Sequence, residues 1–598
     1  MGIPISRWSR GLDSTPDKHR PNVVFVLTDD QGYGDLSCHG NPILRTPCLN
    51  SLYSDSVRLT QFHVGPTCAP TRAGLMTGHF ANSTGVWHTI GGRSLLREDE
   101  WSLASAFKEA GYRTALFGKW HLGDAYPYRP QDRGFETTVI HGGGGISQTP
   151  DYWGNDYFDD TYRADGESRP FEGYCTDVWF REAMAYIKAH REEPFFCAIT
   201  TNAPHSPYNV PTSYRVPYMD CCPDERTRFY GMIANIDENV GKLWNHLRRE
   251  GLEEETILIF MTDNGSSGGA SLDQNGFVRE GYNAGMRGIK GSPYDGGHRV
   301  PFFLRWPAAG LAGGRDVPQL ASHVDFMPTL LDLCGIPAGD HTFHGLSLKP
   351  LLFEERDSEW PGRALVTDSQ RLVLPVKWRQ SATMTDRWRL INGSELYDLS
   401  VDPGQKRDVS RKHRNVVRRL RDSYEKWWDG VTLRANEEIP FPLGGVCGTT
   451  RLTCHDWRND DCHCPWNQSH IRAGLQANGY WEVNVLDAGE YTVELRRWPE
   501  ETGRGVTEGV VGDDVTWRSE WISRKDWSHY SGGEALPVTR ARLKIGEVEE
   551  ECPVDPKVPC VTFSVNLKKG PAHLWTCFSD EKGGELGAYY VRVSKAFL

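Results

Sequence analysis

Acidic and amide side chains directly follow two apolar runs of the sequence, at residues 23–27 and 257–261. These four residues are Asp29, Asp30, Asp263 and Asn264. Oxygen ligands without imidazole or thiolate select a hard cation, Ca²⁺ or Mg²⁺. Either pair alone is typical of an ordinary turn. Two pairs, each placed directly after a run that is typical of a buried strand, favour a metal site.

Basic and imidazole side chains follow two further apolar runs. Lys119 and His121 follow residues 114–117, and His205 follows residues 195–200. The ligand of an open α/β sheet lies beyond the carboxyl ends of its strands. We therefore expect one cleft to gather these side chains and the acidic pairs, although they lie far apart in the sequence.

Strands and helices alternate in the region that must position these residues. Each apolar run has four to six residues, which is the pattern of a strand buried on both faces. Helical patterns cover residues 101–110 and 226–250, and a glycine follows each of them. This alternation predicts an α/β fold with a mostly parallel sheet flanked by helices.

The composition of the chain changes twice along its length, which predicts three domains. Residues 21–335 are the predicted α/β domain that carries the strand-end residues. Residues 336–435 are a smaller α+β subdomain with an amphipathic helix at 416–428. The segment 436–447 is rich in Pro and Gly and is interpreted as a boundary. Short alternating runs over 448–598 predict a β-rich, sandwich-like module.

The most specific segment of the chain runs from Cys68 to Gly78 and contains Cys-x-Pro-x-Arg followed by x-x-Leu-x-Thr-Gly. It resembles the signature of the sulfatase family, of the formylglycine-dependent arylsulfatase type. A lone Cys is by default a buried structural residue, but further motifs of the family also appear. These are Asp29-Asp30, Gly118-Lys119-Trp120-His121, Pro204-His205, Asp263-Asn264-Gly265, the Lys290 of 288–291, and the stretch 395–404. The resemblance covers roughly residues 21 to 430.

The resemblance implies a fold of the alkaline-phosphatase superfamily and hydrolysis of a sulfate ester, on an aryl sulfate or a sulfated carbohydrate. It also implies that Cys68 is oxidised to formylglycine, which requires a maturation enzyme as a partner. One calcium ion is then implied, held by Asp29, Asp30, Asp263, Asn264 and the modified residue 68. The chain departs from the family pattern at Cys48-Leu49-Asn50, where an Asn-Leu-Asp triplet is usual. That departure lies outside the metal and sulfate residues.

The chemistry at residue 68 follows from this resemblance. A hydrated aldehyde carries two hydroxyls, one to attack sulfur and one whose deprotonation expels sulfate and restores the aldehyde. Arg72 lies one helical turn after Cys68, where its charge stabilises the hydrate. His121 is the candidate base for the elimination step.

The sulfate-binding residues are expected to be Lys119, His205 and Lys290. The two lysines supply positive charge where the sulfate oxygens gain negative charge in the transition state. His205, together with Lys119, is the candidate acid for the leaving oxygen. Three neighbouring motif residues are interpreted as structural, namely His298, His323 and Asp325.

Length, charge and composition exclude several classes of protein. The chain has 598 residues, a formal net charge of −12 and 11% aromatic residues. The aromatic content excludes a mainly disordered chain, and the negative charge disfavours a nucleic-acid scaffold. No run approaches the length of a membrane span. The first residues lack an apolar signal region, so the expected compartment is the cytoplasm, or the periplasm or exterior if a signal was removed.

Two other functions remain as alternatives. The first is a phosphate or phosphonate ester hydrolase of the same superfamily, whose members often bind two transition-metal ions with additional His or Asp ligands. No surplus His cluster is visible beside Asp263 and Asn264 in the sequence. The second is a catalytically dead glycan-binding protein, which predicts the loss of at least one key residue. None of the key residues is lost.

The β-rich module carries two further patterns. It holds eight tryptophans, which fit either a core or a glycan-contacting surface, and the core reading is favoured. Cys454-His455 and Cys462-His463-Cys464 match no strong zinc template, so disulfides or buried thiols are expected there. Substrate specificity is expected from the loops at 141–175 and 206–225 and from the edge of the module. The four glycines of 142–145 would permit close approach of a ligand.

Overall fold

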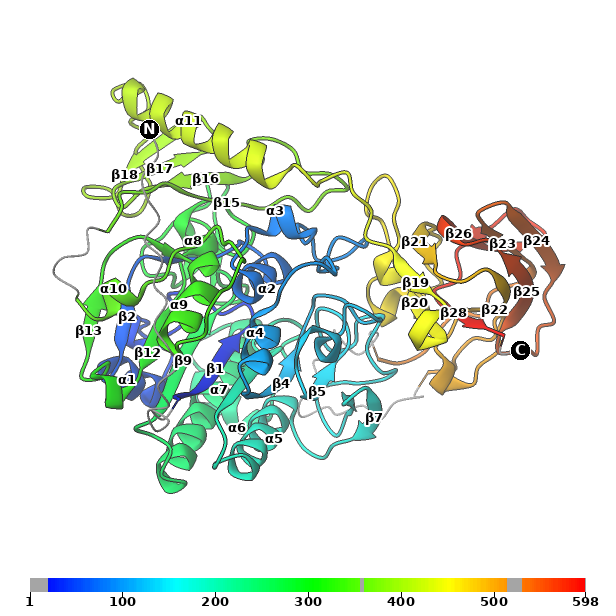
Figure 1. The fold of residues 1–598 in the computed structure, drawn as a ribbon, viewed down its shortest axis with the longest axis horizontal. Coiled ribbons are helices and arrows are strands. Elements are labelled where there is room, and N and C mark those ends of the chain that lie inside the picture. Colours follow the sequence, from blue (N-terminus) through cyan, green and yellow to red (C-terminus); the bar gives the residue numbers. More distant parts are fainter. Residues whose placement is uncertain (1–19, 355–359, 513–529, 597–598) are drawn as a thin grey trace, which may run out of the picture.

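A ten-stranded sheet forms the centre of the computed structural model, which describes residues 20–354, 360–512 and 530–596 (Figure 1). Its strands, in spatial order, are β13 (Arg315–Val317), β2 (Val57–Leu59), β12 (Phe302–Arg305), β9 (Thr256–Thr262), β1 (Asn22–Thr28), β8 (Phe195–Thr200), β4 (Arg113–Lys119), β5 (Thr137–His141), β6 (Thr161–Ala164) and β7 (Glu167–Pro170). The strands from β9 to β5 pair in parallel, and antiparallel pairs lie toward both edges. The prediction of a mostly parallel sheet is therefore confirmed.

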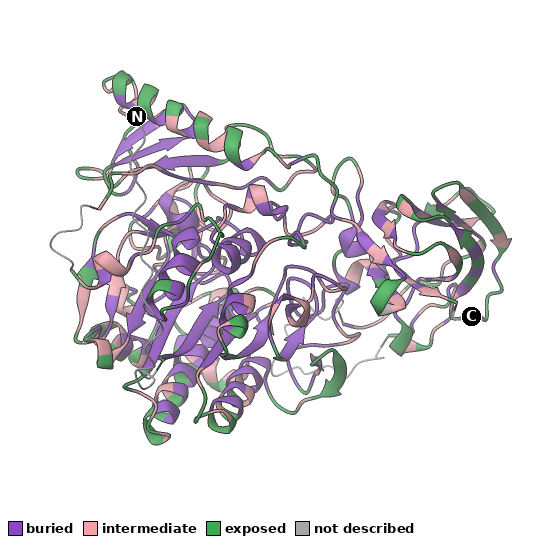
Figure 2. Ribbon diagram, viewed as in Figure 1, coloured by how far each residue is buried: buried purple, intermediate pink, exposed green. Residues whose placement is uncertain are grey.

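Helices cover both faces of this sheet because its central strands are apolar on both faces. In β1, Val23, Phe25 and Leu27 pack in one core, while Val24 and Val26 pack in the other. The first core includes residues of α2 (Cys68–Thr77), α4 (Leu103–Glu109) and α9 (Phe326–Leu333). The second includes residues of α1 (Pro47–Ser54), α5 (Cys175–Ala189) and α7 (Asp224–Arg249). Figure 2 shows the buried strands between helices that expose one side. The helices predicted at 101–110 and 226–250 correspond to α4 and α7.

A four-stranded antiparallel sheet lies beside the central sheet. Its strands are β15 (Leu365–Asp368), β16 (Ser381–Met384), β17 (Trp388–Ile391) and β18 (Glu395–Asp398). The helix α11 (Arg414–Val431) packs on this sheet through Val431, which joins a core with Ile391 and Tyr397. The helix predicted at 416–428 lies within α11.

The C-terminal part is a β-sandwich of two sheets around one core. The first sheet contains β19 (Phe441–Leu443), β21 (Tyr480–Val485), β26 (Gly570–Asp580), β23 (Val538–Ile545), β24 (Val548–Pro553) and β27 (Glu585–Leu586). The second contains β20 (Thr449–Thr453), β28 (Tyr590–Lys595), β22 (Gly489–Arg496) and β25 (Val561–Leu567). Trp457, Trp481 and Trp498 are buried in this core, as a core role for the tryptophans predicts, whereas Trp575 is partly exposed and Trp466 is 37% exposed. Trp517, Trp521 and Trp527 lie outside the described residues.

Short elements complete the described part of the chain. They are α3 (Ala81–Thr84), α6 (Thr212–Arg215), α8 (Asp295–His298), α10 (Lys349–Leu352), α12 (Gln468–Arg472), β3 (Phe62–His63), β14 (Ala321–Ser322), β10 (Ala270–Leu272) and β11 (Val278–Gly281). Among the helices of the described residues, none has the length and apolar character that crossing a membrane requires.

We propose that the domains follow the predicted division at 21–335, 336–435 and 448–598. The three groups of sheets support it, because their strands occupy successive parts of the sequence. One detail differs from the expectation. The segment 436–447 contains β19, which pairs in parallel with β21, so the sandwich begins inside the stretch interpreted as a boundary. A three-residue edge strand leaves few hydrogen bonds to lose, so the prolines of this segment are tolerated there.

A buried ion pair joins the four-stranded sheet to the central domain. Arg389 of β17 is 0% exposed, and its Nε lies 2.9 Å from the Asp295 Oδ1 of α8. Its Nη2 also donates to Gln61 and lies 3.2 Å from His63 Nε2. Because these partners lie far away in the sequence, one guanidinium fixes the position of the small sheet against the large domain.

We predict that Arg389→Met lowers the free energy of unfolding by about 3–5 kcal/mol, because it leaves the Asp295 carboxylate buried and unpaired. Arg387→Met is the matched control, since Arg387 pairs with Asp398 while 55% of its side chain is exposed. That change should cost no more than about 1 kcal/mol. Urea unfolding of both variants measures the difference, and equal losses would contradict the structural role of Arg389.

Candidate active site

Three carboxylates converge at the carboxyl ends of β1 and β9. The parallel register pairs Thr28 with Thr262, so the residues that follow these two strands lie side by side. The backbone N–H of Asp30 donates to Asp263 Oδ1 at 3.1 Å. Each of Asp29, Asp30 and Asp263 is buried, and each offers an oxygen within 4.8 Å of the others. The prediction that the two acidic pairs meet at one end of the sheet agrees with this geometry.

The donor atoms of this cluster fit a hard cation. Asn264 uses its Nδ2 to donate to Asp30 Oδ1 at 2.8 Å. Its Oδ1 and the Oδ1 of Asp29 are buried and have no hydrogen-bond partner among the described residues. Burial, followed by the charge of Asp29, raises the pKa of Asp263 to about 7. An all-oxygen set with unpaired acceptors and crowded negative charge is the environment that Ca²⁺ or Mg²⁺ stabilises.

Three cationic side chains contact these carboxylates, one for each. Arg72 Nη2 donates to Asp263 Oδ2 at 2.9 Å, and Lys119 Nζ donates to Asp29 Oδ2 at 2.6 Å. Lys290 Nζ lies 2.7 Å from Asp30 Oδ2.

These contacts decide the protonation state of Asp29. Burial alone would raise the pKa of its carboxyl group, but the positive charges, with that of Lys119 the largest, lower it well below its usual value. The carboxylate therefore stays ionised.

Cys68 is the first residue of α2, and its side chain meets His121 at the end of β4. The Cys68 Sγ lies 3.4 Å from His121 Nδ1. His121 Nε2 lies 2.9 Å from the Thr89 carbonyl oxygen and must donate to it, which leaves Nδ1 as the acceptor that faces residue 68. Burial, followed by the charge of Lys119, lowers the pKa of His121 well below its usual value. A neutral imidazole with a free lone pair can accept a proton from a group on residue 68.

His205 and Lys290 lie at the solvent side of the cluster. Their side chains are partly exposed, at 18% for His205 and 16% for Lys290, whereas Lys119 is fully buried. The His205 Nε2 lies 3.6 Å from Asp30 Oδ2. Both groups therefore lie on the more exposed side of the cluster.

All ten predicted site residues lie in this one region. Two of them adopt a backbone conformation that is uncommon for residues with side chains, with φ of 68° at Asp30 and 63° at His121. Such strained positions cluster at functional sites. Three residues outside the predicted site set lie around His121. Thr89 fixes its tautomer, Gly144 lies against its ring, and His455 of the sandwich places a ring centroid 6.3 Å away.

Gly144 had a signal in the sequence, but its reason is different from the expected one. A Cβ at this position would lie 2.3 Å from Cε1 of His121. The glycine therefore makes room for the imidazole, where the sequence predicted close approach of a ligand. The contacts of Thr89 and His455 had no signal, because one is a backbone carbonyl and the other belongs to a different domain.

A second group of His and Asp residues lies near the site, although the sequence showed no surplus His cluster beside Asp263. It consists of His63, Asp295 and His298. His63 Nδ1 lies 2.9 Å from His298 Nδ1, and the Arg389 guanidinium contacts both Asp295 and His63. Two of its three members are imidazoles, and these contacts link all three side chains, so we interpret the cluster as a structural network.

The cysteines of the sandwich do not form a zinc cluster in the described residues. Cys454, Cys462, Cys464, Cys552, Cys560 and Cys577 are free cysteines, and no metal-ligand group among the described residues contains a Cys. Cys454 and Cys464 are buried, and burial raises the pKa of both thiols. Of the two expectations for this region, buried thiols hold for these two residues.

Comparisons with known proteins identify the family of this chain. The sulfatase family model matches residues 21–336, and a model of the C-terminal region of N-sulphoglucosamine sulphohydrolase matches residues 290–428. Mouse arylsulfatase J is 27% identical over 65% of this chain and 67% of its own length. Human N-acetylgalactosamine-6-sulfatase is 27% identical over 59% of this chain and 69% of its own length.

A solved structure shows a similar fold with a bound carbohydrate. The crystal structure of Ps i-CgsB in complex with k-i-k-neocarrahexaose aligns with a TM-score of 0.60 and 25% identity, over 69% of this chain and 93% of that chain. The family model covers more than half of the 598 residues. The chain therefore belongs to the sulfatase family and is a sulfuric ester hydrolase.

Proposed function

We propose that this enzyme removes sulfate from a sulfated carbohydrate, with residue 68 acting as formylglycine and calcium bound at the carboxylate cluster. One observation carries the proposal. The side chain of residue 68 faces the free Nδ1 of His121 beside three carboxylates and three cationic groups. The similarity to N-acetylgalactosamine-6-sulfatase, and to a protein solved in complex with k-i-k-neocarrahexaose, supports a sugar sulfate as the substrate class.

Burial explains why an unmodified Cys68 is a poor nucleophile. It raises the pKa of the thiol, so the thiolate is disfavoured despite the neighbouring Lys119. The hydrated form of formylglycine would supply two hydroxyl groups at the same position, and neither requires that a thiolate forms. Arg72 lies on the same helix and is 3% exposed. Its guanidinium donates to Asp263 and to the carbonyl oxygen of Lys119, which would keep its positive charge in place to stabilise the hydrate at residue 68.

The chain's own residues would then divide the remaining work. Calcium, when bound to Asp29, Asp30, Asp263 and Asn264, would supply positive charge beside residue 68 and the sulfate. Lys119 and Lys290 would bind sulfate oxygens, since both ammonium groups reach the cluster. His121 would accept a proton at Nδ1, and His205 would donate one at the exposed side where the alcohol leaves.

Phosphate or phosphonate esters are the second candidate class, and the site favours them less. The carboxylate cluster contains no histidine ligand, whereas the other His and Asp group of the described residues is neutralised by Arg389. A single-cation site with oxygen ligands fits the sulfatase chemistry better than a site for two transition-metal ions.

We expect mass spectrometry of the peptide that contains residue 68 to show the mass of an aldehyde in place of a thiol. The enzyme should then release sulfate from 4-nitrophenyl sulfate, and Cys68→Ala should abolish the release. An unmodified Cys68 in fully active enzyme would contradict the assignment of formylglycine. Faster hydrolysis of 4-nitrophenyl phosphate would instead support the phosphatase alternative.

Adding calcium back to protein from which a chelator has removed it should raise the free energy of unfolding. At 100 times its dissociation constant, a ligand that binds only the folded state adds about 2.7 kcal/mol. Asp30→Asn removes one charged ligand and should weaken calcium binding, measured by calorimetry, by about tenfold or more. Asp237→Asn is the control, because Asp237 is a buried carboxyl that binds the N–H groups of Cys48 and Leu49 outside the cluster. Equal affinities for the two variants would argue against the proposed metal site.

His121→Gln should lower kcat for 4-nitrophenyl sulfate by about 10²–10⁴-fold, because it removes the proton acceptor that faces residue 68. The KM should change little, since His121 makes no proposed contact with the sulfate. His246→Gln serves as the control, because His246 is a buried histidine of α7 outside the site. If His121→Gln kept wild-type kcat across the pH profile, the role of His121 as base would be wrong.

A further inference from the structure

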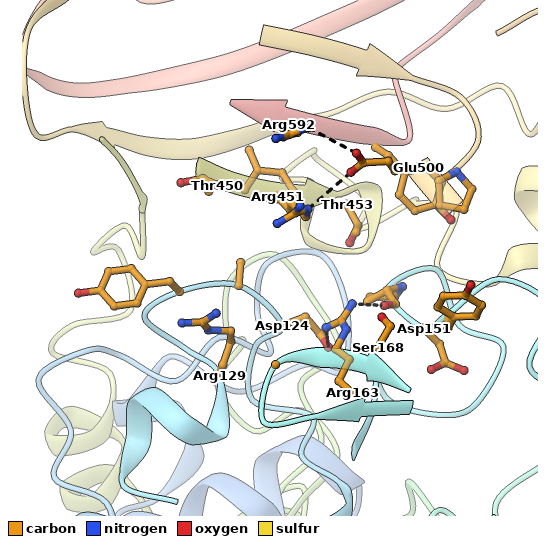
Figure 3. Close-up of a pocket in the computed structure, with 18 of the residues that line it drawn as sticks. Asp124, Arg129, Asp151, Arg163, Ser168, Thr450, Arg451, Thr453, Glu500 and Arg592 are labelled. Atoms are coloured by element: carbon orange, nitrogen blue, oxygen red, sulfur yellow. Dashed lines mark hydrogen bonds and ion pairs between the residues drawn. The ribbon is translucent and has the colours of Figure 1, made fainter. Parts of the chain in front are cut away.

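A cavity of about 750 Å³ lies between the central domain and the β-sandwich (Figure 3). One wall comes from residues 123–131, the loop at 149–152 and the hairpin of β6 and β7. The other wall comes from β20, β28 and residues 496–501. None of the candidate catalytic or metal-binding residues lines this interdomain groove. Its volume is in the range of ligand-binding pockets.

Arginines project into the groove from both walls. Figure 3 shows Arg129 and Arg163 on the side of the central domain, with Arg451 and Arg592 on the side of the sandwich. The side chain of Arg451 is 69% exposed. Arginine binds the oxygens of sulfate and phosphate groups with its planar set of donors, so this arrangement suits a ligand with more than one anionic group.

Three of these four arginines make long ion pairs inside the groove, whereas Arg129 makes a close ion pair with Asp132, with its Nε 2.7 Å from Asp132 Oδ2. Arg451 lies 3.8 Å from Glu500, which is shared with Arg592 at 3.4 Å. Arg163 lies 3.5 Å from Asp124. Contacts of this length in partly exposed side chains contribute little to stability. These three arginines can therefore bind an external oxyanion at low cost, and Glu500 and Asp124 can accept hydrogen bonds from hydroxyl groups.

Hydroxyl and aromatic groups accompany these charges. Ser168 and Thr453 line opposite walls of the groove, and Tyr152 and Tyr590 also line it. Sugar rings offer hydroxyl groups to polar side chains and apolar faces to aromatic rings. The groove is also lined by carboxylates, namely Asp124, Asp151, Glu167, Glu500 and Glu501. Arginines on both walls together with these acceptors match a sulfated carbohydrate, which carries both anionic groups and hydroxyl groups.

One loop separates the groove from the catalytic histidine. Gly144 lies against the His121 ring, while Thr149, Pro150 and Asp151 of the same loop line the groove. Asp124, three residues after His121, accepts a hydrogen bond from Gly143 N at 2.9 Å and also lines the groove. A chain bound in the groove therefore lies next to the hydrolytic site without occupying it.

We propose that the interdomain groove is a second, non-catalytic site that binds a segment of a sulfated oligosaccharide. The proposal rests on the proposed function, because it assumes that the substrate is a sulfated glycan. It assigns the sandwich a direct role, since Arg451 and Arg592 come from this domain. The bound segment holds a long substrate at the enzyme while another part of the same chain is hydrolysed.

The test measures how full-length enzyme binds sulfated and desulfated oligosaccharides. Binding of sulfated hexasaccharides from carrageenan, chondroitin and heparin to the inactive Cys68→Ala variant is measured by calorimetry, together with their desulfated forms. At least one sulfated hexasaccharide should bind, and the double variant Arg451→Gln/Arg592→Gln should weaken it by about tenfold or more. Raising the salt concentration should weaken it as well.

Three comparisons make the outcome decisive. Arg540→Gln is the matched control, because Arg540 is an exposed sandwich arginine that pairs with Glu551 outside the groove. Ser168→Trp, a change on the exposed strand β7, should also weaken binding by filling the groove. Turnover of 4-nitrophenyl sulfate by enzyme with an intact Cys68 should be the same in all groove variants, so a failed sulfatase activity is recognised separately.

The proposal is overturned if no sulfated hexasaccharide binds, or if the groove variants bind it as tightly as the Arg540→Gln control. Equal binding of sulfated and desulfated forms would overturn the assignment of a sulfated ligand. Loss of 4-nitrophenyl sulfate turnover in the parent enzyme would count against the proposed function, whereas the calorimetry would still report on the groove.

Discussion

The parallel pairing of β1 with β9 places the buried carboxylates of Asp29 and Asp263 side by side, and the rest of the site compensates for their negative charge. Both side chains are 0% exposed. Buried like charges are costly unless opposite charges neutralise them. Arg72, Lys119 and Lys290 come from three other segments and contact the three carboxylates one by one. The sheet therefore dictates which positions of the chain must be cationic.

The ion pairs of Lys119 and Lys290 with the carboxylates also bear on the proposed binding of sulfate. Because Lys119 and Lys290 are held at short range by the carboxylates, their positive charge is already ordered before a sulfate arrives. The protein as a whole carries a net charge of −12. Long-range attraction of an anionic substrate is weak at physiological salt, since charges are screened beyond about 8 Å. Anion binding is thus a local property of the sheet edge and, as proposed, of the interdomain groove.

The sequence predicted the elements whose signal is local. Buried strands appear as continuous apolar runs, so β1, β4, β8 and β9 and the residues after them were predictable, as was their meeting at one end of a parallel sheet. The tautomer of His121 was not, because it depends on the backbone carbonyl of Thr89, which any residue type could supply. The position of β19 was hidden by Pro and Gly, and the contact of His455 depends on how two domains pack.

The sandwich has a consequence for the loops that surround His121. These loops lack regular structure of their own, and the sandwich binds their backbone. Gly91 N donates to His455 O at 2.8 Å, and Thr149 N donates to Trp466 O at 2.9 Å. The segment 88–93 carries Thr89 near one such contact, and the loop 142–152 carries Gly144 near the other. Because the proposed hydrolytic groups follow the strands of the sheet and the sandwich contacts the loops around them, we expect changes in the sandwich to alter substrate choice while the proposed chemistry at residue 68 is retained.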